Sequence, residues 1–267
     1  MTHSRARIHE LLGGELAPRR DLGQNFVGDP NTVRKIAALA QVGPGDHVVE
    51  IGAGLGSLTL ALAETGAAVT AVEVDRGIVP VLRDVVADQP NVTVVEADAT
   101  TIDWDDLLAP APRWTLVANL PYNIATPLVA DLLDTAPQIA AMLVMVQKEV
   151  AQRFAAAPGS KQYGAVSVKV AYWATARIVG EVPPSVFVPR PNVDSALVRI
   201  DRRTPPDTDR AELFDLVRTA FGQRRKMLRR SLAGRVAPER FAAANVAPEA
   251  RPEDLDLAAW VRLADAR

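Results

Sequence analysis

The chain has 267 residues, of which 48% are hydrophobic and 23% are charged, and this balance excludes collagen-like, disordered and coiled-coil proteins. Its 30 basic residues nearly cancel its 32 acidic residues, so a nucleic-acid partner cannot be inferred from net charge and would have to show as a local cluster. The absence of cysteine excludes disulfides, thiolate metal sites and cysteine nucleophiles.

The N-terminal segment MTHSRARIHELLGG mixes charged and apolar residues and lacks the hydrophobic stretch of a signal peptide. The longest apolar run, Ile139 to Val146, is too short to span a bilayer. We therefore expect no membrane role and a cytoplasmic address. The length exceeds that of a usual domain, which predicts one large domain or a core with a small appendage.

The first half of the chain alternates predicted helices and strands. A helix is expected from Pro30 through Gln41, because Asp29 can cap its first turn and proline suits its first position. From residue 46 to residue 150, β-branched runs alternate with helix-period segments, as in βα units around a parallel sheet. The predicted strands are His47–Ile51, Val69–Val74, Val92–Glu96, Leu116–Asn119 and Met142–Val146. The helices between them are predicted near Leu58–Glu64, Gly77–Val86 and Ala125–Leu133.

After Gly164 the pattern changes to two β-rich stretches, Val166–Ile178 and Ala196–Asp201. We interpret both as antiparallel additions to the edge of the sheet. The segment 202–207 contains two prolines and interrupts this pattern, and the sequence beyond it is rich in alanine, leucine and charge, which favours helices. A domain boundary is predicted there.

Three glycines, Gly52, Gly54 and Gly56, occupy the turn between the first predicted strand of the sheet and the following helix. Glycines tolerate positive φ and let backbone amides approach a ligand closely. Their GxGxG spacing differs from the GxGxxG of dinucleotide sites, which argues against a nicotinamide cofactor. The alternative is a tight turn that binds no ligand.

Acidic residues follow at the ends of the next two strands. Glu73 can accept hydrogen bonds from both hydroxyls of a ribose, and Asp98 can bond the amino group of an adenine. Because the carboxyl ends of parallel strands share one edge of the sheet, we expect these polar residues to line a ligand crevice. Taken singly, either acid is equally compatible with a solvated loop.

The tetrapeptide Asn119-Leu120-Pro121-Tyr122 directly follows the fourth strand, and Asn-x-Pro-aromatic is typical of amino methyltransferases. The lone pair of the 6-amino nitrogen of adenine is delocalised into the ring. The nitrogen therefore becomes nucleophilic only when hydrogen-bond acceptors engage its N–H groups. The side-chain oxygen of Asn119 and the carbonyl of Leu120 can do this, because Pro121 restricts the local geometry. Tyr122 can stack on the base. The alternative is a strand-end turn with asparagine as a cap and tyrosine in the core.

Seven segments, collinear over nearly the whole chain, resemble the ribosomal RNA adenine dimethyltransferase family, and most closely its bacterial small-subunit branch. They are GQNFV at 23–27, EIGAGLG at 50–56, EVDR at 73–76, NLPYNIATP at 119–127, QKEVAQR at 147–153, FVPRPNVDSALVRI at 187–200 and FGQRRKMLRRSL at 221–232. The resemblance implies methyl transfer from S-adenosylmethionine to two adjacent adenosines in a hairpin loop near the 3′ end of 16S rRNA.

The resemblance also implies roles for individual residues. Asn25 and the backbone of Val27 would contact the cofactor, with Gln24 beside them. Gly52, in the turn with Gly54, would contact its amino-acid moiety, Glu73 its ribose and Asp98 its adenine. Asn119 would lie between cofactor and target, and Phe187 would be a second stacking aromatic opposite Tyr122. The chain departs from the family at Val27, where leucine is usual, and at Ala53, where many relatives have proline.

A basic segment runs from Arg218 to Arg240, with eight basic residues and one acid, Glu239. In an acidic protein such a cluster predicts contact with an RNA backbone, because phosphate contacts dominate affinity for nucleic acids. The alternative is a solvated helix face whose charges pair with acids, but only one acid lies within the segment. The candidate RNA contacts are Arg224, Arg225, Lys226, Arg229 and Arg230.

Together these observations predict an α/β class I S-adenosylmethionine-dependent methyltransferase, with a Rossmann-like, mostly parallel sheet, an antiparallel edge and a small helical C-terminal domain. The predicted parts are an N-terminal arm (1–24), a catalytic domain (25–203) and a helical RNA-binding domain (204–267). The expected partner is 16S rRNA within an immature small ribosomal subunit, and we expect a monomer that needs no metal. Two alternatives are the branch of the family that methylates one adenine of large-subunit RNA and a non-catalytic assembly or transcription factor that retains the fold.

Overall fold

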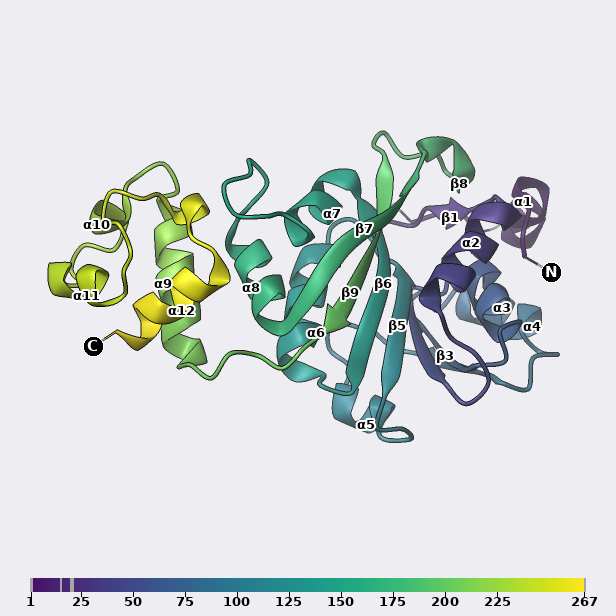
Figure 1. Ribbon diagram of the computed structural model, residues 1–267. Helices are drawn as coiled ribbons and strands as arrows, with labels where there is room; N and C mark the ends of the chain where they lie inside the picture. Colours follow the sequence, from purple (N-terminus) through teal and green to yellow (C-terminus); the bar gives the residue numbers. More distant parts are fainter. Residues whose placement is uncertain (1, 15, 20–21, 267) are drawn as a thin grey trace. The chain divides into compact units, whose positions relative to one another are not determined.

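The computed structural model describes residues 2–14, 16–19 and 22–266. Its largest feature is a seven-stranded sheet in the order β4-β3-β2-β5-β6-β9-β7 (Figure 1). The strands are β2 (His47–Ile51), β3 (Ala68–Glu73), β4 (Val92–Glu96), β5 (Trp114–Asn119), β6 (Ile139–Gln147), β7 (Ala174–Val182) and β9 (Ser195–Arg202). The five strands from β2 to β6 are parallel to one another, and β9 pairs antiparallel with β6. The expected parallel sheet with an antiparallel edge is therefore confirmed.

The helices of the first half follow the strands as the sequence predicts. They are α2 (Pro30–Ala40), α3 (Ser57–Ala63), α4 (Val79–Val85), α5 (Trp104–Leu108) and α6 (Ala125–Thr135), of which only α5 was not predicted. The carboxylate of Asp29 accepts the backbone N–H of Thr32, so the predicted cap of α2 is present. Apolar residues of α2 and α3, such as Ile36 and Leu62, pack with Val48 and Val117 of the sheet and form its main core.

The predicted strand at Val166–Ile178 is wrong over most of its length. Residues Ala165–Trp173 form helix α8, and only the last part of the stretch enters a strand, β7, which continues to Val182. The apolar residues of α8 are spread around the helix rather than gathered on one face, with Val168, Val170 and Tyr172 all buried. A helix that is apolar on several sides gives no 3.6-residue period, so its β-branched residues favoured a strand.

Strands β1 (Phe26–Val27) and β8 (Phe187–Val188) and helix α1 (Arg5–Leu12) are short elements outside the main sheet that were not predicted. Strand β1 pairs antiparallel with β8, so the N-terminal segment is held by a part of the chain 160 positions away (Figure 1). Helix α1 buries Ile8 and Leu12 against Phe26 and Leu55. Much of the predicted N-terminal arm is thus packed on the catalytic core.

Contacts divide the chain into two compact units, residues 1–151 with 177–201 and residues 152–176 with 202–267. The second unit contains the C-terminal end of α7 (Lys148–Phe154), together with α8, α9 (Arg210–Gly222), α10 (Leu228–Ser231), α11 (Pro238–Ala243) and α12 (Leu257–Asp265). Its core joins Tyr163 and Val168 to Leu216 and Trp260. The sequence places 152–176 in the catalytic domain, whereas these residues pack with the C-terminal helices because α8 buries its apolar side chains there.

Candidate functional site

A pocket lies at the carboxyl ends of β2, β3 and β5. Strands β3 and β4 follow on one side of β2, and β5 and β6 on the other, so the strand order reverses at β2. Open α/β sheets bind ligands at this kind of position. The pocket brings together most of the residues that the sequence singled out. These are Gln24, Asn25, Val27, Gly52, Gly54, Glu73, Asn119, Leu120, Pro121 and Tyr122.

The glycine turn after β2 is tied to the end of β3 by Glu73. The backbone N–H of Gly54 donates to Glu73 Oε2 at 2.7 Å, and those of Val74 and Asp75 donate to Oε1 at 3.0 and 2.9 Å. Gly54 has a φ of 56°, and a Cβ on it would lie 3.0 Å from the ring of Phe26. Glycine is therefore required here both for backbone conformation and for close packing.

Glu73 is 5% exposed, and this burial raises the pKa of its carboxyl group, while the backbone hydrogen bonds from Asp75, Gly54 and Val74 oppose that rise. Each carboxylate oxygen offers two acceptor sites, so the backbone donors do not exhaust the acceptor capacity of Glu73. The residue can hold the turn and still accept hydroxyl groups of a ligand in the pocket.

Glu50 lines the same pocket and was missed by the sequence analysis. It is 1% exposed, and among the described residues none donates to its Oε2. Burial, helped by the negative charge of Glu73 and opposed by the hydroxyl of Thr59, raises the pKa of Glu50 from its usual 4.5 to about 8. A buried carboxyl oxygen without a donor is an acceptor available to a cationic or hydrogen-bonding ligand in the pocket. The signal was present in EIGAG, where an acid stands in an otherwise apolar strand.

The orientation of Asn119 is set by the N-terminal segment. Its Nδ2 donates to the backbone carbonyl of Asn25 at 2.9 Å, so its Oδ1 remains an acceptor. The next residue provides a second acceptor, because among the described residues none donates to the carbonyl oxygen of Leu120. Two acceptor oxygens in adjacent residues suit a planar amino group with two protons.

The segment before β1 is held by contacts with Pro121, after β5, and with Asp75, after β3. A Cβ on Gly23, whose φ is 63°, would lie 3.1 Å from Pro121 Cβ, which shows how closely the two segments approach. The side chain of Gln24 donates to Asp75 Oδ2 at 2.7 Å and accepts the backbone N–H of Arg19. Gln24 therefore holds the segment in place, while the backbone of Asn25 orients Asn119.

Two predicted site residues do not line the pocket. Phe187 is 1% exposed and lies in the core opposite Val27, so it presents no open ring face to a base. Asp98 is exposed at the end of β4, and its Oδ1 accepts the backbone N–H and the hydroxyl of Thr100. Tyr122 does line the pocket, and its hydroxyl lies 2.9 Å from Ser195 Oγ.

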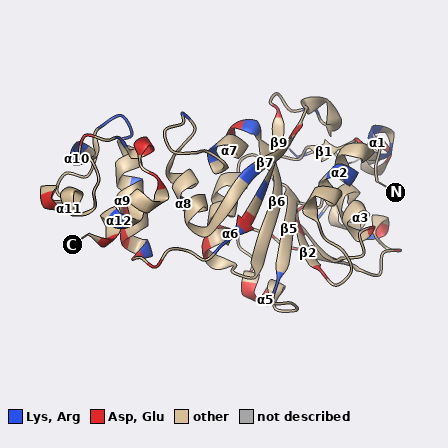
Figure 2. Cartoon of the chain, viewed as in Figure 1, with Lys and Arg blue, Asp and Glu red and all other residues tan. Residues whose placement is uncertain are grey.

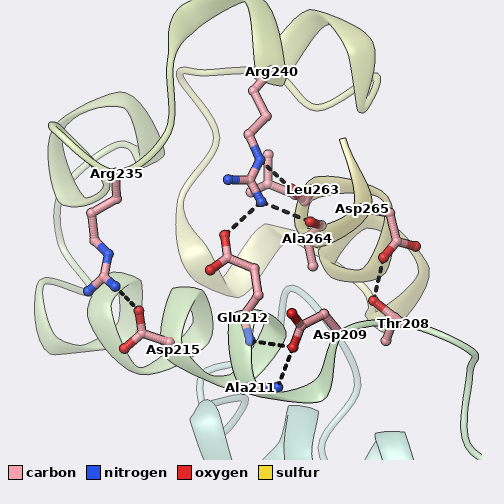
Figure 3. Close-up of polar contacts among 10 residues, drawn as sticks. All are labelled: Thr208, Asp209, Ala211, Glu212, Asp215, Arg235, Arg240, Leu263, Ala264 and Asp265. Carbon is pink, nitrogen blue, oxygen red and sulfur yellow. Dashed lines mark hydrogen bonds and ion pairs between the residues drawn. The ribbon is translucent and has the colours of Figure 1, made fainter. Parts of the chain in front are cut away.

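The basic segment is more extensively paired than its sequence indicates, because acids outside it supply partners. Figure 2 marks the basic and acidic residues along the chain. Arg224 lies 3.6 Å from Glu253 and donates to the carbonyl of Lys161 at 2.9 Å, and Arg229 lies 3.8 Å from Glu249. Figure 3 shows two further pairs, Arg235 with Asp215 and Arg240 with Glu212.

Arg240 also donates to the carbonyls of Leu263 and Ala264, near the end of α12, which makes it part of the helical framework (Figure 3). By contrast, within the part of the chain that the structure describes, Arg225, Lys226 and Arg230 are exposed and have no ion pair. The free positive charge of the segment therefore lies in these three residues.

Comparison with known proteins decides the family. A family model described as ribosomal RNA adenine dimethylase matches residues 16–266. The chain belongs to this family. A ribosomal RNA small subunit methyltransferase A from Cutibacterium acnes is 47% identical over 277 residues, which cover 97% of this chain and 91% of that protein.

Solved structures agree with the fold of this family. The 23S rRNA methyltransferase ErmE superposes with a TM-score of 0.71 at 27% identity, over 90% of this chain and 98% of that one. A dimethyladenosine transferase from Plasmodium falciparum, at 24% identity, shares the fold with a TM-score of 0.73 over 88% of this chain and 94% of that one. The expected class I methyltransferase fold is confirmed, and membership of the family makes the protein a ribosomal RNA adenine dimethyltransferase whose chemistry depends on S-adenosylmethionine.

Two other kinds of feature are absent from the described part of the chain. Of the helices in the described ranges, none has the length and apolar character needed to cross a membrane. The same residues contain no group of three or more His, Asp or Glu side chains placed to hold a metal ion.

Proposed function

We propose that this dimethylase transfers methyl groups from S-adenosylmethionine to the 6-amino groups of two adjacent adenosines, in a hairpin loop near the 3′ end of 16S rRNA. One observation carries the proposal. Asn119 Oδ1 and the Leu120 carbonyl are adjacent acceptors without donors among the described residues, at the end of β5 and in the same pocket as Glu73. An exocyclic amine with two protons matches this pair.

The choice of small-subunit RNA is supported by the degree of similarity. The small subunit methyltransferase A of Cutibacterium acnes is 47% identical to this chain, whereas the large-subunit enzyme ErmE is 27% identical. Both values are measured over at least nine-tenths of the chain, because the matches cover 97% and 90% of it. We therefore assign the protein to the small-subunit branch, with 16S rRNA in an immature small subunit as its partner. We further propose that it acts as a monomer in the cytoplasm.

The pocket suits the cofactor in charge and hydrogen bonding. Glu73 would accept the ribose hydroxyls, the turn at Gly52 and Gly54 would receive the amino-acid moiety, and Asn25 with the Val27 backbone would close the opposite side. Glu50 fits the same ligand, because its orphaned buried Oε2 can accept from a cationic group. Asp98 would bond the adenine from the rim, where its Oδ2 is available beside the bonds to Thr100.

The transfer is a direct displacement in which the chain's residues chiefly position the reactants. S-adenosylmethionine supplies an electrophilic methyl group on its sulfonium. In the first transfer, Asn119 Oδ1 and the Leu120 carbonyl would each accept a hydrogen bond from one N–H of the amine, which directs the nitrogen lone pair out of the plane of the base. An asparagine amide is too weak a base to take a proton at neutral pH, so the proton released after methylation would pass to solvent.

Two further contacts would deliver the RNA. The target adenine must leave its stack to reach the pocket, and the ring of Tyr122 offers a surface on which it can stack. Arg225, Lys226 and Arg230 are the exposed cations without acidic partners in the described chain, and they would contact RNA phosphates. The paired Arg224 and Arg229 would contribute less.

The direct test is methyl transfer to small ribosomal subunits that lack the modification. With tritiated S-adenosylmethionine, we expect label to enter 16S rRNA, and nucleotide mapping should find dimethyladenosine at two adjacent positions in a loop near the 3′ end. Large subunits and deproteinised 23S rRNA are the controls. Label in the large-subunit RNA would assign the protein to the other branch, and cofactor binding without any transfer would support a non-catalytic factor.

A further inference from the structure

The antiparallel strand β9 brings its first residue to the active edge of the sheet. In the order β5-β6-β9, Met145 of β6 pairs with Asn119 on one side and with Leu197 on the other. Because β9 runs opposite to its neighbours, its N-terminal residue Ser195 lies level with Gln147, at the carboxyl end of β6. A parallel strand in this place would have its C-terminal residue at this edge of the sheet instead.

Tyr122, three residues beyond the end of β5, reaches over the end of β6 to this serine. The two hydroxyl oxygens lie 2.9 Å apart, and the Ser195 side chain is 0% exposed. The backbone around Ser195 is itself fixed, because Lys148 N donates to the Asp194 carbonyl at 2.9 Å. Burial raises the pKa of the Tyr122 phenol, while the bond to Ser195 opposes that rise, so the phenol keeps its proton and the hydrogen bond near neutral pH.

We propose that Ser195 is a positioning residue that fixes where the ring of Tyr122 lies, the surface on which the target adenine stacks. This inference rests on the proposed function of Tyr122. A tyrosine ring has two side-chain torsions, and a loop residue with a half-exposed ring would otherwise sample several orientations. A hydrogen bond between the Tyr122 phenol and the buried Ser195 hydroxyl holds the phenolic oxygen in place, which restricts the first torsion before the base arrives.

The geometry matters because methyl transfer depends on alignment. The amine must meet both the Asn119 and Leu120 acceptors, and the position of the base depends on where the ring beneath it lies. The tie to Ser195 runs through β6, which also carries the partner of Asn119. The residue that holds the stacking ring and the residue that carries the first amine acceptor are thus both positioned by pairing with the same strand, β6.

A double-mutant cycle tests the proposal with the full-length protein. Ser195→Ala is expected to slow the single-turnover rate of methyl transfer about three- to tenfold, the value of one hydrogen bond, at saturating cofactor and undermodified subunits. In a Tyr122→Phe background the same change should have less than about a twofold effect, because the partner hydroxyl is already absent. Ser167→Ala, another buried serine, which lies in the second unit, controls for loss of stability.

Thermal unfolding gives an independent readout. In Tyr122→Phe the buried Ser195 hydroxyl loses its partner, so adding Ser195→Ala should raise the Tm of that variant rather than lower it. Equal effects of Ser195→Ala on the rate in both backgrounds, together with a lowered Tm in both, would overturn the positioning role. A Tyr122→Ala variant with the wild-type rate would instead overturn the stacking function of Tyr122, and the role of Ser195 with it.

Discussion

The side-chain nitrogen of Asn119 makes a hydrogen bond that leaves the side-chain oxygen, Oδ1, as the atom available to the substrate. Because Nδ2 donates to the Asn25 carbonyl, the side chain cannot turn its nitrogen toward the substrate without breaking a 2.9 Å hydrogen bond. The oxygen is then held ready for a proton of the target amine. An acceptor fixed before the reaction lowers the barrier more than one that must be reoriented during it.

Asn119→Ala should therefore reduce the saturated single-turnover rate by about 10²–10³, the usual cost of losing one preorganised hydrogen bond in a transition state. RNA affinity should change little, since it rests mainly on phosphate contacts. Binding and rate are measured in parallel on undermodified small subunits, and Asn31→Ala, at an exposed position of α2, is the control. A variant that keeps more than about half of the wild-type rate would show that NLPY is only a structural turn.

Glu50 makes the stability of the protein depend on pH in an unusual direction. Its pKa is raised from 4.5 to about 8, so between these values the folded protein holds a proton that the unfolded chain has released. The free energy of unfolding must then fall as the pH rises through this window, by about 1.4 kcal/mol per pH unit at most. Above the folded pKa the full cost of burying the charge is present.

Replacing this acid by its neutral isostere should remove that dependence. We expect Glu50→Gln to change stability little near about pH 5 and to stabilise the protein increasingly toward about pH 8, because glutamine never carries the buried charge. Urea unfolding at several pH values measures the difference from wild type, with the exposed Glu239→Gln as the control substitution. A stability difference that stays constant with pH would contradict the burial of an ionisable Glu50.

At the scale of elements, the basic segment separates into framework and surface residues. Arg224 and Arg240 donate to backbone carbonyls as well as to acids, so they join parts of the second unit to one another. The side chains of Arg225, Lys226 and Arg230 make no such contacts within the described ranges. The number of basic residues in the sequence therefore overstates the positive charge that is available to bind RNA phosphates.

Two triple variants with the same change in charge distinguish these groups. Replacing Arg225, Lys226 and Arg230 by alanine should weaken RNA binding and reduce the slope of log affinity against log salt by up to about 0.9 for each phosphate that is no longer neutralised. Replacing Arg218, Arg229 and Arg235, each of which pairs with an acid, should change the slope less. Equal slopes for the two variants would mean that pairing does not decide which cations bind RNA.

The elements that the sequence predicted well carry local signals. Helix α2 has its cap and proline at Asp29 and Pro30, and β2 to β6 are apolar runs between turn residues. Helix α8 has no such signal, because neighbours from α9 and α12 bury it on several sides. The site was predicted where motifs are contiguous, as in NLPY, and missed where distant residues meet. The Ser195 contact with Tyr122 and the acidic partners of the arginines belong to the second kind, whereas the signal for Glu50 stood in the contiguous segment EIGAG.

At the scale of the whole molecule, the second unit is assembled from two separate stretches of the chain. Residues 152–176 supply Tyr163, Val168 and Tyr172 to its core, and residues 202–267 supply the other fully buried apolar side chains. Every residue that lines the pocket belongs to the first unit. A cut at the predicted boundary after residue 203 therefore removes no pocket residue but divides the core of the second unit.

A chain truncated to residues 1–203 should accordingly bind S-adenosylmethionine and yet lose the order of α8. Without α9 and α12, the apolar side chains of α8 have no partners, and a nine-residue helix is not stable in water by itself. Limited proteolysis should cut within residues 155–173 of the truncated chain, where the full-length protein is protected. Trp260→Ala in the full chain, which loosens the same core at a typical cost of about 3–5 kcal/mol, should show intermediate protection. Equal protection of α8 in the truncated and full-length chains would mean that 152–176 folds with the catalytic sheet and that the boundary after residue 203 is a true domain boundary.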